Sequence, residues 1–205
     1  LTWKRSTYWL SIRHEKEVPM RNSLIELIKK LNPVIDSIPR EFDSPDKIEA
    51  QLHAKLPIEY RSFLEANKTT LKFDSIIGYT PIKPSPWASS KNGMQHLDML
   101  YGLASAKNSL LNKLNTYTDR IPDGCLPIGD AGGGNQILLS TRPGDYGKVY
   151  FWNHEEEMNE KGDPATGNAG MYLAADSFVD FVERLSVEED EDDLDDGLES
   201  ITLRV

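Results

Sequence analysis

The sequence predicts an α+β fold, with a central antiparallel β-meander packed by N-terminal helices and by one C-terminal helix. Up to Tyr117, most apolar residues recur at the spacing of amphipathic helices. After Ile121, short apolar runs alternate with turn residues, which is typical of strands joined by hairpins. Helices therefore come first and strands follow, without the strand–helix alternation that predicts a parallel sheet.

The helical part has clear starts. Asn22 to Leu31 carries apolar residues at i, i+3, i+4 and i+7. A second helix begins at Ser44, whose hydroxyl can cap the first turn, with a proline following it. It stops before Pro57, which opens a short third helix. Ser105 to Tyr117 predicts a further helix, because its leucines fall on one side.

Between these helices lies a segment of mixed character. Leu71 to Gly78 favours a strand. Three prolines within Thr80 to Gly93 predict a loop or an edge segment. We expect Leu97 to Leu103 to form at least one helical turn.

The meander is predicted from three short apolar runs, Cys125 to Ile128, Gln136 to Ser140 and Lys148 to Asn153. A polar loop then leads to a short strand, Met171 to Ala174. Ser177 has an aspartate three residues later, a spacing typical of a helix start. The helix that follows places Phe178, Phe181, Val182 and Leu185 on one face.

The composition of the chain indicates its cellular compartment. Its 205 residues contain one cysteine, Cys125, so no internal disulfide can form. This favours the cytoplasm over secretion. No apolar run approaches the roughly 20 residues of a membrane-spanning helix. The sequence therefore predicts no contact with a membrane.

The formal net charge of −10 is concentrated in one segment. Nine acidic residues lie between Glu188 and Glu199 with no basic residue among them, and subtracting them from −10 leaves −1. A nearly neutral body without a basic stripe argues against direct nucleic-acid binding. We expect the acidic run to be solvated and dispensable for folding. The alternating residues Ile201 to Val205 are a candidate edge strand.

Three regions follow from these patterns. Residues 1–34 are an N-terminal extension and helix, residues 35–187 the α+β domain, and residues 188–205 an acidic tail. Met20 is one candidate for a natural start, which would make the first 19 residues foreign to the natural protein.

No catalytic or metal constellation is visible. The glycine-rich segment Asp130 to Asn135 is followed by a strand, whereas a phosphate loop leads into a helix. The four histidines are scattered, no Gly-x-Ser-x-Gly is present, and Cys125 is expected to be a buried apolar side chain. We therefore expect no enzymatic activity, catalytic residue, metal or cofactor.

Adjacent aromatic residues mark the third strand of the meander. Alternation places Tyr150 and Trp152 on one face and Phe151 on the other. Either both faces are covered and all three side chains belong to the core, or one face is an aromatic binding surface.

Five segments, in order along the chain, carry a family pattern: LPIEYRSFL at 56–64, IP at 121–122 with LPIGD at 126–130, GNQI at 134–137, GKVYFWNHE at 147–155 and ADSFVDF at 175–181. Together they resemble the SUKH superfamily, the Smi/Knr-type proteins. Asn67 to Thr70 departs from the family's usual Asn-Gly-Gly, and Asn153 replaces an aspartate. No counterpart is recognised before Ile35 or after Leu185.

The resemblance implies an α+β domain that binds another protein. Bacterial members act as immunity proteins against polymorphic toxins, often nucleases, and fungal members regulate cell-wall assembly through protein contacts. We therefore expect a non-enzymatic immunity protein that occludes a cognate toxin, and the alternative is an intracellular regulator of wall assembly. The sequence leaves the oligomeric state open.

The expected binding surface is the edge of the meander. An exposed aromatic residue with an acidic rim would suit the basic cleft of a nuclease toxin. The alternative surface is the proline-rich loop Thr80 to Gly93. The candidate contact residues are Asp130, Asn135, Trp152, His154, Glu155 and Glu156.

Overall fold

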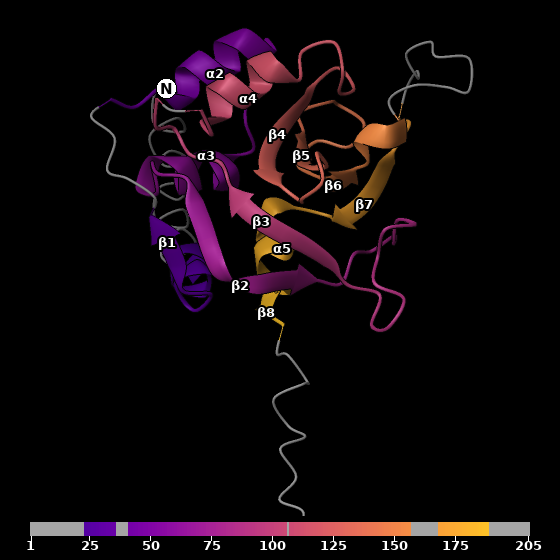
Figure 1. The fold of residues 1–205 in the computed structure, drawn as a ribbon. Coiled ribbons are helices and arrows are strands. Elements are labelled where there is room, and N and C mark those ends of the chain that lie inside the picture. Colours follow the sequence, from indigo (N-terminus) through magenta and orange to yellow (C-terminus); the bar gives the residue numbers. More distant parts are fainter. Residues whose placement is uncertain (1–22, 36–40, 106, 157–167, 189–205) are drawn as a thin grey trace, which may run out of the picture.

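A computed structural model describes residues 23–35, 41–105, 107–156 and 168–188. Within these ranges, eight strands form one sheet in which neighbouring strands are antiparallel. Seven of them follow the chain in the order β1 to β7, and β8 pairs with β2. The predicted α+β fold with a central antiparallel meander is confirmed (Figure 1).

The first half of the sheet contains two strands that the sequence did not predict as strands. One is β1 (Pro33–Ile35), and the other is β3 (Gln95–Leu100). The helical turn expected over Leu97 to Leu103 is therefore wrong. β2 (Leu71–Tyr79) was predicted as a strand and pairs with β1, β3 and β8.

The meander continues through β4 (Cys125–Asp130), β5 (Gln136–Ser140), β6 (Val149–Trp152) and β7 (Met171–Ala175). All four strands were predicted, and each pairs antiparallel with the next, so the connections alternate between the two ends of the strands. A short final strand, β8 (Ser186–Val187), completes the sheet.

The helices begin where their capping residues predict. The Ser44 hydroxyl accepts from the backbone N–H of Lys47 at the start of α2 (Pro45–Leu52), and Pro57 is the N-cap of α3 (Ile58–Ala66). The Ser177 hydroxyl caps α5 (Phe178–Arg184). α4 (Leu110–Thr116) is shorter than the predicted helix, because Ser109 is its N-cap. The helix predicted from Asn22 to Leu31 is confirmed and covers residues 23–29.

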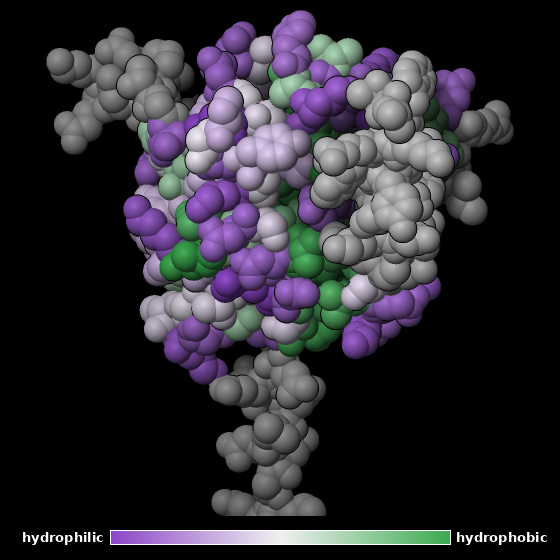
Figure 2. All heavy atoms as spheres, turned by 180° about the vertical axis from the view of Figure 1, so that it is seen from behind, coloured by the Kyte–Doolittle hydropathy of each residue, from purple (hydrophilic) through white to green (hydrophobic). Residues whose placement is uncertain are grey.

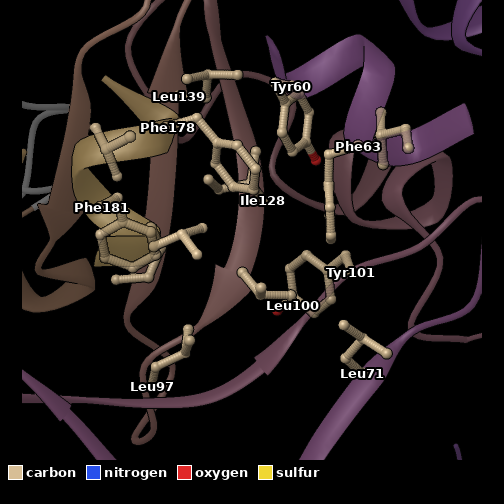
Figure 3. Packing of buried hydrophobic residues seen from close by; sticks show 14 of the residues in the cluster. Tyr60, Phe63, Leu71, Leu97, Leu100, Tyr101, Ile128, Leu139, Phe178 and Phe181 are labelled. Carbon is tan, nitrogen blue, oxygen red and sulfur yellow. The ribbon is translucent and has the colours of Figure 1, made fainter. Parts of the chain in front are cut away.

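Two apolar clusters lie on opposite faces of the meander. The larger one joins the sheet to α3 and α5, where Tyr60 and Phe178 stack edge-on with ring centroids 4.8 Å apart (Figure 3). The smaller cluster consists of Tyr117, Cys125, Leu138 and Trp152. The residues of β6 alternate between them as predicted, with Phe151 in the larger cluster and Trp152 in the smaller.

Candidate functional site

The turn between β4 and β5 places backbone unusually close to other segments. Gly132, Gly133 and Gly134 have φ values of 77°, 60° and 96°, a region that side chains disfavour. The Asp130 carboxylate accepts from the N–H of Gly132 at 2.9 Å and fixes the turn. A Cβ atom at Gly134 would lie 3.2 Å from ring atoms of His154. Glycine therefore allows the imidazole to lie directly against the turn.

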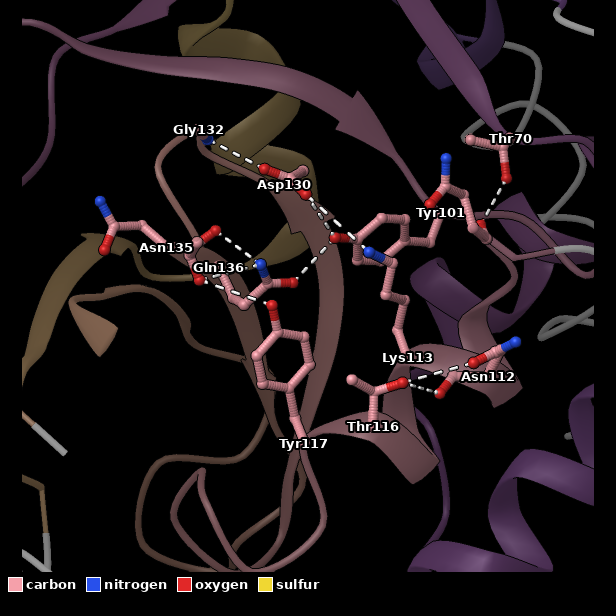
Figure 4. Close-up of polar contacts among 12 residues, drawn as sticks. Thr70, Tyr101, Asn112, Lys113, Thr116, Tyr117, Asp130, Gly132, Asn135 and Gln136 are labelled. Atoms are coloured by element: carbon pink, nitrogen blue, oxygen red, sulfur yellow. Dashed lines mark hydrogen bonds and ion pairs between the residues drawn. The ribbon is translucent and has the colours of Figure 1, made fainter. Parts of the chain in front are cut away.

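A buried polar layer supports this turn from below. The Tyr101 hydroxyl lies 2.8 Å from Gln136 Oε1 and 3.1 Å from Asp130 Oδ2 (Figure 4). Lys113 approaches the same carboxylate oxygen at 4.0 Å. Burial and the neighbouring Asp130 raise the pKa of the Tyr101 phenol, which stays protonated and can donate. Asp130 therefore acts mainly within the turn.

Asn135 connects the turn to the end of β6. Its Oδ1 atom lies 3.0 Å from His154 Nδ1 and accepts from the His154 N–H at 3.2 Å. The next side chain, Glu155, is exposed. Glu156 is held back, because its Oε1 atom accepts from the Asn153 amide at 2.9 Å and lies 3.0 Å from the Tyr172 hydroxyl. The structure thus brings Asn135, His154 and Glu155 together.

The exposure expected for Trp152 is wrong. Its side chain is only 1% exposed and packs edge-on against Tyr117, with ring centroids 5.9 Å apart. The α4 end covers this face of the meander, so alternation alone could not decide whether the face was open. Trp152 supports the surface from the interior and offers a partner no contact area.

A different tryptophan supplies an exposed aromatic at this surface. Trp87 is 55% exposed and lies in the proline-rich loop between β2 and β3. Together with the glycine turn and the end of β6 it lines a groove of about 320 Å³. We call this the turn groove. Its lining residues are Trp87, His96, Ala131, Gly132, Gly133, Asn135, Phe151, His154 and Glu155.

The proline-rich loop is held in place by buried contacts. The Ser85 hydroxyl accepts from the Gln95 amide at 2.6 Å and from the Trp87 N–H at 3.1 Å. The Ile82 and Lys83 N–H groups donate to carbonyls of β7, at 3.1 and 2.8 Å. The loop therefore covers the outer edge of β7 and presents Trp87 from an anchored backbone. The alternative surface Thr80 to Gly93 includes Trp87, but sequence reasoning named neither Trp87 nor His96 as a contact residue, although a tryptophan among prolines was a usable signal.

Comparison with known proteins identifies the family of this chain. Residues 43–184 match the sequence profile of the SMI1 / KNR4 family (SUKH-1), and this range is well over half of the chain. The chain belongs to this family. It is also similar to the SPbeta prophage-derived uncharacterized protein YokK of Bacillus subtilis (strain 168), at 34% identity over 166 residues. That alignment covers 77% of this chain and 81% of the relative. No solved structure matches.

The motifs that identify this SUKH-1 domain contribute mostly to its core. Tyr60, Phe63 and Leu64 of the LPIEYRSFL segment are at most 2% exposed, and so are Phe178 and Phe181 of the ADSFVDF segment. Two further motifs supply the glycine turn and His154 with Glu155. Trp87 lies outside all of them. The turn groove thus combines segments that carry the family resemblance with a loop that does not.

Carboxylates lie in and beside the turn groove: Glu155 lines it, and Asp98 and Glu188 adjoin two of its lining residues, Gly132 and His96. Asp98 and His96 lie on the same side of β3, and a Cβ atom on Gly132 would be 3.3 Å from Asp98 Oδ2. Burial, and then the nearby charge of Asp130, raise the pKa of Asp98. Glu188 follows β8 and lies 2.8 Å from His96 Nε2, while the Asn92 amide donates to its other oxygen at 2.7 Å. Negative charge therefore gathers on several sides of the turn groove.

The described part of the SUKH-1 domain offers little support for a metal site, a reactive cysteine or a membrane-spanning helix. Within the described ranges, no group of three or more His, Cys, Asp and Glu side chains is placed to hold a metal ion. Cys125 is buried as predicted, and burial raises the pKa of its thiol to about 11, which leaves little nucleophilic thiolate. No helix in the described part of the chain is long and apolar enough to cross a bilayer.

Proposed function

We propose that this SUKH-1 protein is an immunity protein, which binds a cognate toxin in the cytoplasm and blocks it by occlusion. The observation that carries the proposal is the turn groove, where the exposed Trp87 stands beside an acidic rim. Tryptophan is enriched among the residues that dominate the energy of protein interfaces. A carboxylate rim suits a toxin with a basic active-site cleft, such as a nuclease.

Two further observations support this reading over a catalytic one. The polar side chains beneath the glycine turn are satisfied by one another, as Tyr101, Asp130 and Gln136 illustrate. They stabilise the turn and are not aimed at an outside substrate. The similar Bacillus protein is prophage-derived by name, and we expect toxin and immunity genes to travel together on mobile elements.

Co-expression tests the proposal. Toxin domains encoded beside the gene are expressed in a host cell with and without this protein. We expect the protein to restore growth with one of them and to bind that domain as a purified pair. A protein that rescues cells from no neighbouring toxin domain and binds none would refute the immunity function. A partner among wall-assembly proteins would then favour the regulator.

A further inference from the structure

We propose that the turn groove captures a cationic side chain of the partner, with the Trp87 indole as its platform and the Asp98 and Glu155 carboxylates as its counter-charges. This inference rests on the proposed function, because it names the chemistry that a toxin must present to this surface. An arginine fits best, since its planar guanidinium stacks on an aromatic face and donates to carboxylates at the same time.

The first argument is the exposure of Trp87. The indole is 55% exposed although the loop that carries it is anchored. Its apolar surface therefore lacks the stabilisation that burial in the core would give. The hydrogen bonds of Ser85 fix the backbone from which it projects. Binding therefore costs little ordering of the loop, which favours an indole that acts as a preformed platform.

The second argument is the imbalance of charge around the groove. Among the described residues, neither Asp98 nor Glu155 forms an ion pair, and Asp98 lies within the fields of both the repulsive Asp130 carboxylate and the favourable His96 ring. The nearby Lys113 is engaged below the turn, by Asp130 and by the ring of Tyr101 at 4.9 Å. A partner cation would relieve this repulsion, whereas a partner carboxylate would increase it.

Part of the floor of the groove is apolar. Phe151 is 3% exposed and lines it together with Ala131 and the glycine turn. An arginine side chain combines an apolar stem with a charged end, so the stem can cover this floor while the guanidinium reaches the rim.

Nuclear magnetic resonance on the full chain tests the inference directly. The probe is the blocked tripeptide acetyl-Gly-Arg-Gly-amide, and the matched probe carries citrulline, which is nearly isosteric but neutral. We expect the arginine peptide to shift the Trp87 indole N–H and the Gly132 to Gly134 amides in a saturable way, and the citrulline peptide to leave them unchanged. The double variant Asp98→Asn/Glu155→Gln should weaken the apparent affinity about tenfold.

Control variants separate this site from general electrostatics. Tyr146 is 49% exposed and lines another cleft together with Glu59, so Tyr146→Ala and Glu59→Gln should bind the peptide as the unchanged protein does. Equal shifts with citrulline, or shifts confined to the acidic residues after Glu188, would overturn the inference. So would an affinity that the double variant leaves unchanged.

The toxin itself distinguishes the two proposals. If a neighbouring toxin domain is neutralised and binds Trp87→Ala as tightly as the unchanged protein, the inference fails and the immunity function stands. If the arginine peptide binds at the groove but no toxin domain is bound, the immunity function fails and the cation site stands.

Discussion

At the scale of single residues, burial decided roles that the sequence pattern left open. Trp152 and Trp87 are both tryptophans near turns, yet one is buried and the other exposed. Glu49 is a similar case. In the sequence it is one of several charged residues of α2 and carries no sign of burial, but in the structure its side chain is only 5% exposed. Its carboxylate is held by Lys55 at 2.6 Å and by Arg61 and the Leu56 N–H, both at 3.1 Å.

This carboxylate should couple stability to pH. Burial alone raises the pKa of Glu49, but the hydrogen bonds from Lys55, Leu56 and Arg61 outweigh it and lower the pKa below the usual 4.5. The stabilisation is therefore complete above pH 4.5 and is lost as the pH falls through the lower value of the folded state. We expect Glu49→Gln to reduce the free energy of unfolding by about 2 kcal/mol at pH 7. Urea denaturation at several pH values measures this. A gap between the two proteins that does not shrink toward pH 3 would show that the charge is unimportant.

At the scale of elements, helix caps and turns could be predicted from the sequence, whereas the conformation of β3 could not. Ser44, Pro57 and Ser177 mark helix starts through their own chemistry, so no distant contact was needed to find them. β3 was mistaken for a helix because Leu97, Leu100 and Leu103 are spaced three apart, which imitates a helical face. Only its pairing with β2 and β4 settles its conformation.

The element scale also gives a stability test for α5. Phe181 is fully buried and lies edge-on to Tyr79, with ring centroids 5.1 Å apart. Phe181→Ala should lower the free energy of unfolding by about 3–5 kcal/mol, because the cavity removes contacts between α5 and the sheet. The exposed Glu183 on the same helix provides the control, and Glu183→Ala should change stability by less than about 0.5 kcal/mol. Similar losses for both variants in chemical denaturation would mean that the helix face is wrongly assigned.

At the scale of the whole molecule, the charge distribution links the turn groove to Glu188, the first residue of the acidic run. The family profile at 43–184 falls inside the predicted domain of residues 35–187, whose boundaries stay a prediction.

Glu188, the first residue of the acidic run, is not free in solvent, since Asn92 and His96 hold it beside the groove. These hydrogen bonds lower the pKa of Glu188 and keep it charged. The candidate strand Ile201 to Val205 lies outside the described residues. We therefore expect the acidic run to start at the rim where a basic partner would bind.

The most direct test is the affinity of the purified protein for the toxin domain encoded beside its gene. Isothermal titration calorimetry at low and high salt compares the unchanged protein with Glu155→Lys/Glu156→Lys and with the matched control Glu183→Lys. The immunity function predicts tight binding that weakens with salt, a clear loss on reversing Glu155 and Glu156, and no change in the control. Absence of binding by the unchanged protein to every such domain would contradict the immunity function. An affinity and salt dependence that the reversal leaves intact would contradict the acidic rim as the binding surface.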